Sequence, residues 1–276
     1  WVSYPQIVHL ARATPVMVPG DPEWGFKVSV ADLERHRTAA TRGLIICSPC
    51  NPTGSVYTAA ELAAIAAWAG EHKIWLISDE IYRRIYYGAG SAPSLFDLDD
   101  SVLAHSVVIY GASKAYAMTG WRIGAAYAPA EVLKAMAALQ SHTTTGANQP
   151  AMWAAAEAFG NPARDPEVEL MVAAFRRRRD CLVARFQDQA PGVEFVEPHG
   201  AFYIFFRVDG LAPGMGGAAF CERLMSEEGV ALVPGAAFGD DRWVRLSYSV
   251  SDAELEAASD RLMRFIARLG VASATR

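Results

Sequence analysis

The chain has 276 residues, of which 52% are hydrophobic and 20% are charged. This composition is ordinary for a globular protein with a sizeable core, and the length favours one large domain with a smaller one. The net charge of -5 is mild and charges of both signs are interspersed, which argues against a nucleic-acid partner or an anionic membrane surface. Because neither a membrane span nor a signal peptide is recognisable, we expect a cytoplasmic protein that acts on small molecules.

Strands alternate with helices through the first half of the chain. Short apolar runs predict strands at residues 44–47, 74–77, 106–110 and 123–127. Thr58 and Glu61 form a capping box for a helix that ends near residue 72, and helical spacing returns at 129–139. This order is typical of a mostly parallel sheet with crossover helices.

The last third of the chain has a different pattern. A long charged helix is predicted at 166–187 and a shorter one at 218–228. Strands are predicted at 201–207, 229–233 and 243–248, and a capping box at Ser251 and Glu254 opens a closing helix that fades near residue 270. We therefore predict an α/β domain over residues 1–160 and a smaller α+β domain over residues 161–276.

The four cysteines give little sign of metal or redox chemistry. Only Cys47 and Cys50 are spaced like a ligand pair, and no second pair follows at metal-ligand spacing. We predict reduced thiols and no metal site.

Polar residues gather where the predicted parallel strands end, at 48–54, 79–82 and 111–122. Ligands of open parallel sheets bind beyond these strand ends. Lys114, one of only four lysines, lies there among small and aromatic neighbours that leave room for a bulky group. A partly desolvated amine loses its proton readily and becomes a Schiff-base nucleophile. A surface lysine on a loop is the simpler interpretation of Lys114 alone, and its neighbours decide against that.

Three more side chains extend this interpretation. Gly120 lets the chain bend, so that Arg122 could fold back near the lysine and bind a phosphate, to which Ser113 could add a hydroxyl. Asp79 could hold the proton of a pyridine nitrogen, although an Asp-Glu pair is more often a helix cap or a solvated pair. The residues thus indicate a site for a phosphorylated aldehyde.

Four motifs in order carry a specific resemblance to the class I aminotransferases of fold type I, most of all to bacterial aspartate aminotransferases. They are Ser48 to Gly54 (SPCNPTG), Ser78 to Tyr82 (SDEIY), Gly111 to Gly124 (GASKAYAMTGWRIG) and Val244 to Tyr248 (VRLSY). The resemblance implies pyridoxal 5′-phosphate (PLP) as cofactor, and a mostly parallel sheet flanked by helices with a smaller C-terminal α+β domain.

The resemblance also implies a role for each matching position. Lys114 would be the Schiff-base lysine and the proton-transfer base, and Asp79 would pair with the ring nitrogen. Tyr82 and Asn51 would bind the ring oxygen, and Arg122 and Ser113 the phosphate. The substrate carboxylate would be bound by Arg245 with help from Asn51. Trp1 would stack on the ring, although a plain core aromatic is an equal interpretation.

The implied reaction is a ping-pong transfer of an amino group from an amino acid to a 2-oxo acid. Aspartate and 2-oxoglutarate are the first expected pair, and aromatic amino acids or prephenate are alternatives. A homodimer is also implied. Such families carry about a hundred further residues before the position of Trp1, so we expect a fragment of a longer enzyme.

Other function classes fit the residues less well. A carbon-sulfur lyase could share every motif, and only its independence of a 2-oxo acid would separate it from an aminotransferase. A ligand-sensing domain of a transcription regulator would add a DNA-binding segment, and none is recognisable. A Rossmann dehydrogenase would carry G-x-G-x-x-G after an early strand, and none follows.

Overall fold

The computed structural model describes residues 1–274 and divides into two compact units, each described by itself. The mixed-sheet unit comprises Val16–Cys50 and Ser55–Val172. The antiparallel-sheet unit comprises Trp1–Pro15, Asn51–Gly54 and the chain from Ala173 onward. The domain boundary between residues 160 and 161 stays a prediction.

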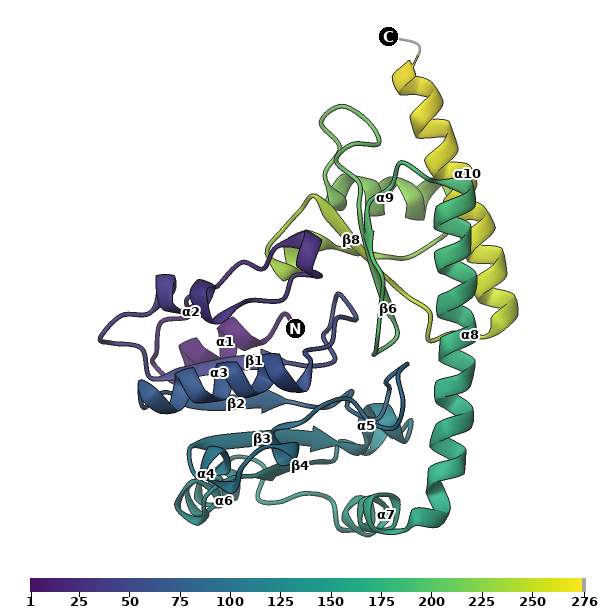
Figure 1. The fold of residues 1–276 in the computed structure, drawn as a ribbon. Coiled ribbons are helices and arrows are strands. Elements are labelled where there is room, and N and C mark those ends of the chain that lie inside the picture. The colour runs from purple at the N-terminus through teal and green to yellow at the C-terminus, as the bar shows by residue number, and fades with distance from the viewer. Residues whose placement is uncertain (275–276) are drawn as a thin grey trace. The chain divides into compact units, whose positions relative to one another are not determined.

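The mixed-sheet unit is built on four strands in the order β1-β2-β3-β4 (Figure 1). Their bounds are Gly43–Cys47, Trp75–Asp79, Ser106–Gly111 and Gly124–Tyr127. The first three strands are parallel, and β4 is antiparallel to β3. The register pairs Cys47 with Asp79 and Asp79 with Ile109, so the carboxyl ends of β1, β2 and β3 lie at one edge. The predicted, mostly parallel sheet is confirmed.

Helices of this unit flank the sheet. They are α2 (Val30–His36), α3 (Ala59–Glu71), α4 (Asp100–Leu103), α5 (Ala112–Ala115), α6 (Ala130–Thr143) and α7 (Gln149–Gly160), with 3₁₀ turns η1 (Pro22–Trp24), η2 (Leu95–Asp97), η3 (Thr119–Trp121) and η4 (Pro162–Arg164). The predicted capping box opens α3: Glu61 N donates to Thr58 Oγ1, and Thr58 N donates to the Glu61 carboxylate. Apolar residues of α2, α3 and α4 then pack with those of β1, β2 and β3 into one core.

The antiparallel-sheet unit contains the order β5-β6-β8-β7 with every neighbouring pair antiparallel. The strands are β5 (Phe195–Val196), β6 (Tyr203–Arg207), β7 (Val233–Pro234) and β8 (Trp243–Ser247), and the helices are α1 (Tyr4–Leu10), α9 (Gly217–Glu228), α10 (Asp252–Ala274) and the turn η5 (Gly235–Phe238). Helix α8 (Asp165–Gln189) begins in the mixed-sheet unit and continues into this one. Phe206 of β6 packs on Phe186 of α8 and Phe220 of α9, so one face of the sheet is covered by helices.

Some elements differ from the sequence expectations. The strand predicted at 229–233 is wrong for most of its length, because Gly229 adopts φ +67° and ends α9 in the left-handed conformation. Extended pairing starts only at Val233. The Ser251–Glu254 capping box is confirmed, and its helix continues past residue 270 to Ala274.

Two properties of residues 1–274 bear on function. Over this range, no helix combines the length and the apolar character that a membrane crossing requires. Over the same range, His, Cys, Asp and Glu side chains form no group of three or more that could hold a metal ion.

Candidate functional site

The edge of the mixed sheet presents Asp79 at the end of β2. Its backbone is held on both sides, because Ser48 N donates to Asp79 O at 3.2 Å and Glu80 N donates to Ile109 O at 2.7 Å. Its side chain is oriented locally, since Ile81 N donates to Asp79 Oδ1 at 3.1 Å. Tyr82 follows with its side chain buried. The carboxylate therefore sits on a backbone fixed by the sheet rather than on a loose loop.

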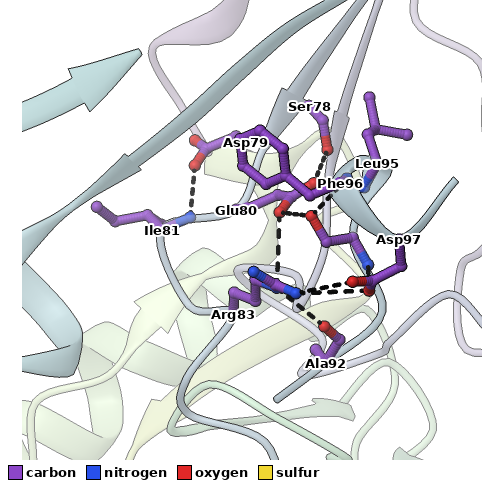
Figure 2. Close-up of polar contacts among 10 residues, drawn as sticks. Ser78, Asp79, Glu80, Ile81, Arg83, Ala92, Leu95, Phe96 and Asp97 are labelled. Carbon is purple, nitrogen blue, oxygen red and sulfur yellow. Dashed lines mark hydrogen bonds and ion pairs between the residues drawn. The ribbon is translucent and has the colours of Figure 1, made fainter. Parts of the chain in front are cut away.

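The neighbouring Glu80 is a buried carboxylate with hydrogen-bond donors around it (Figure 2). Ser78 Oγ donates to Oε1 at 3.0 Å and Leu95 N donates to the same oxygen at 3.1 Å. Ser94 Oγ donates to Oε2 at 2.6 Å, and Arg83 Nε lies 4.0 Å from that oxygen. Successive residues of an extended chain alternate sides, so Asp79 faces away from this network. Glu80 thus ties the segment that carries Asp79 and Tyr82 to the turn at residues 94–97.

Lys114 and its neighbours follow β3 at the same edge. The sequence predicted a loop here, whereas Lys114 lies half-buried in the short helix α5. The turn η3 then leads into Arg122, which is exposed and adopts φ +52°. Thr119 closes this segment, because its Oγ1 donates to Ser113 O at 3.1 Å and its carbonyl accepts from Arg122 Nη1 at 3.1 Å. Lys114, Ser113 and Arg122 therefore belong to one segment that Thr119 closes by hydrogen bonds, and the predicted approach of Arg122 to Lys114 stays a prediction.

The antiparallel-sheet unit holds a second group of predicted residues around Arg245 of β8. Arg245 Nη1 donates to Asn51 Oδ1 at 2.8 Å. Its Nε is buried and has no hydrogen-bond partner, and Arg245 forms no ion pair with any residue from 1 to 274. An arginine shielded from water without an acid partner is unfavourable by itself. The site is consequently suited to an anion from solution.

The segment Asn51–Gly54 reaches this unit by backbone pairing. Gly54 O accepts from His199 N at 2.9 Å and from Gly200 N at 3.0 Å. Gly54 has φ +71°, and a Cβ there would come within 2.4 Å of Pro198 Cβ, so only glycine fits the close approach. Trp1 N donates to Asn51 O at 3.2 Å, and the indole contacts Tyr4 edge-on. Trp1, Asn51 and Arg245 are thus brought together.

The sequence analysis did not identify three residues that lie near Asp79 or Arg245. Glu80 was expected to be a cap or a solvated residue, and it is buried instead. Tyr203 and Phe238 lie against Arg245, with ring centroids 4.5 Å and 5.2 Å from its Cζ. The period-2 pattern of β6 could have placed Tyr203 on a face with Phe205, but no local signal marks Phe238.

Comparisons with known proteins agree on one family. The sequence profile described as aminotransferase class I and II matches residues 1–262. The chain is 40% identical over 269 residues to the aspartate aminotransferase of Bacillus subtilis (strain 168), covering 96% of this chain and 68% of that protein. It is 42% identical over 270 residues to the aspartate/prephenate aminotransferase of Thermus thermophilus, covering 97% of this chain and 68% of that protein.

Solved structures agree. The structure of aspartate aminotransferase from Thermus thermophilus with maleate superposes with a TM-score of 0.89 at 41% identity, covering 96% of this chain and 67% of that chain. The family and fold type that the motifs predicted are confirmed. This chain belongs to the class I and II aminotransferases, enzymes of fold type I whose cofactor is pyridoxal 5′-phosphate.

Proposed function

We propose that this aminotransferase moves the amino group of aspartate to 2-oxoglutarate in a ping-pong reaction. The observation that carries the proposal is the state of Arg245: a half-buried guanidinium that is held by Asn51 and has no acid partner among residues 1–274. Amino acids and 2-oxo acids share an α-carboxylate, which a guanidinium binds through two parallel hydrogen bonds. Because Asn51 Oδ1 accepts from Arg245, the amide nitrogen of Asn51 is the atom left to donate to a ligand.

The residues at the edge of the mixed sheet suit the cofactor. Arg122 is exposed and pairs with no acid in the described part of the chain, so its guanidinium is available for the phosphate, to which Ser113 would add a hydroxyl. Asp79 would keep the ring nitrogen protonated, and Tyr82 with Asn51 would bind the ring oxygen. Trp1 would stack on the ring. When bound, PLP supplies an aldehyde for amine attachment and a ring that accepts electrons.

Lys114 would do the proton chemistry. Its Nζ would hold the cofactor, and as a free amine it would remove the proton from the substrate Cα. The same amine would later give the proton back, so that one residue carries the proton through the whole transfer.

The experiment follows both products. Purified protein is incubated with PLP, aspartate and 2-oxoglutarate, and oxaloacetate and glutamate are quantified; equal amounts of the two products are expected. Prephenate in place of 2-oxoglutarate tests the second substrate, because the Thermus thermophilus relative is named an aspartate/prephenate aminotransferase. Loss of the amino donor without any 2-oxo acid would instead indicate a lyase and would contradict the proposal. Lys114→Ala is the inactive control.

We also propose a homodimer that works in the cytoplasm, as the resemblance implies. Sedimentation equilibrium of the PLP-loaded protein would give twice the chain mass, and a chain mass alone would contradict the dimer.

A further inference from the structure

Arg245 lies on an aromatic face of the antiparallel sheet. The register places Arg245 of β8 opposite Phe205 of β6. Because side chains alternate between faces, Tyr203 shares the face of Phe205, and Trp243 shares that of Arg245. Phe205 stacks on Trp243 at 5.3 Å and contacts Phe238 of η5 edge-on at 6.0 Å. A layer of rings therefore surrounds the guanidinium where a salt bridge would ordinarily be.

Other arginines of this unit also lie over rings, but Arg178, Arg223 and Arg268 each have an acid partner as well. Arg178 lies over Phe175 at 5.9 Å and pairs with Asp252 at 2.5 Å. Arg223 and Arg268 both lie over Phe265, and each also pairs with a glutamate. Arg245 lies nearer to a ring than these three arginines do, with 4.5 Å between its Cζ and the ring centroid of Tyr203, and it has no acid partner within residues 1–274.

We propose that Tyr203 and Phe238 are positioning residues that hold Arg245 for the substrate carboxylate without neutralising it. A ring face attracts a guanidinium through its quadrupole but offers no carboxylate oxygen. An acidic partner would hold the side chain equally well, yet it would compete with the substrate for the same N–H groups. The rings thus fix the direction of the guanidinium and leave its charge for the ligand. This inference rests on the proposed function of Arg245.

The test compares Tyr203→Leu, Phe238→Leu and Tyr203→Phe in the PLP-loaded protein. Each leucine variant should raise KM for both aspartate and 2-oxoglutarate by about tenfold, the equivalent of about 1.4 kcal/mol of binding free energy. Both substrates should be affected because both carry the α-carboxylate, and kcat should change less than KM. Tyr203→Phe keeps the ring and should retain nearly wild-type KM values. Because Phe238 is only half-buried at the end of a 3₁₀ turn, Phe238→Leu tests the idea even if Tyr203→Leu does not fold.

The matched control is Phe175→Leu, which removes a ring from under an arginine that already has an acid partner. It should lower the melting temperature and leave KM unchanged. Succinate binding, measured by its inhibition and by calorimetry, gives a readout that does not depend on turnover. Succinate binding could weaken in both leucine variants while the wild-type protein is inactive. In that case the proposed function fails, but the positioning of Arg245 by Tyr203 and Phe238 is supported. Leucine variants that melt like the control and keep wild-type KM and succinate affinity would overturn the inference.

Discussion

Glu80 in the mixed-sheet unit is a buried carboxylate and Arg245 in the antiparallel-sheet unit is a half-buried guanidinium, yet their surroundings are opposite. The Glu80 carboxylate accepts from two serine hydroxyls and a backbone N–H, with Arg83 nearby. Within residues 1–274, Arg245 has one hydrogen bond, to Asn51, and a buried Nε without a partner. Burying a charge is costly unless it is paired and hydrogen-bonded. A satisfied charge can serve the fold, whereas an unsatisfied one implies a partner that arrives from outside.

The largest effect is expected from Arg245→Gln. Removing the guanidinium should lower kcat/KM for aspartate about 10³-fold, because a desolvated charge pair with the substrate contributes on the order of 4 kcal/mol. The free energy of unfolding should stay the same or rise slightly, since an unpaired charge has been removed. Steady-state kinetics and urea denaturation measure the two quantities. A variant that loses stability and keeps its kcat/KM would reverse the roles assigned to the two charges.

Glu80→Ala should show the converse behaviour. It leaves the Leu95 N–H and the two serine hydroxyls without their acceptor, so the free energy of unfolding should fall by about 3 kcal/mol. Urea denaturation of the PLP-free protein measures this directly. Glu71→Ala, at an exposed glutamate, is the control and should stay within about 0.5 kcal/mol of wild type. Equal, small effects for both variants would show that the buried network contributes little.

Sequence reasoning found the framework of these two regions but not their difference. Strand ends and turn residues placed Asp79, Lys114 and Arg122 at one edge of the sheet, because strand direction and loop position are local properties. Motif resemblance supplied Arg245 and Asn51, which are 194 positions apart in the chain.

The burial of these side chains and the identity of their partners could not be predicted from the sequence, because both depend on segments that are distant in the chain. Glu80 contacts the turn that contains Ser94 and Leu95, and the residue pair Asp79-Glu80 by itself does not predict that contact. Likewise, the contact of Phe238 with Arg245 arises from a 3₁₀ turn that brings the ring to β8. Gly229 shows the same limit for the fold. The run at 229–233 is apolar and suits a strand, but its first residue, Gly229, is the left-handed C-cap of α9.

Supplying Arg245 with a carboxylate from solution should stabilise the protein. At ten times its dissociation constant, succinate should add about 1.4 kcal/mol to the free energy of unfolding and raise Tm by roughly 2 °C. Arg245→Gln should show no such shift, because the charge that recognises the ligand is gone. Differential scanning fluorimetry over a succinate titration measures both. An equal shift in the variant would locate the binding elsewhere on the chain.

The smallest effect is expected from Ser94→Ala, which removes one of the donors of Glu80. Because Ser78, the Leu95 N–H and Arg83 remain around the carboxylate, the loss should be about 1 kcal/mol rather than the cost of an unpaired charge. Ser141→Ala, at an exposed helical serine, is the matched control and should be near neutral. If the network is cooperative, the Ser78→Ala/Ser94→Ala double variant should lose more than the sum of the single losses, because the carboxylate then keeps only the Leu95 N–H on Oε1 and Arg83 at 4.0 Å from Oε2, among the described residues. Additive losses would mean that each donor acts on Glu80 independently, and the contrast with Arg245 would then rest on the number of donors and not on a network.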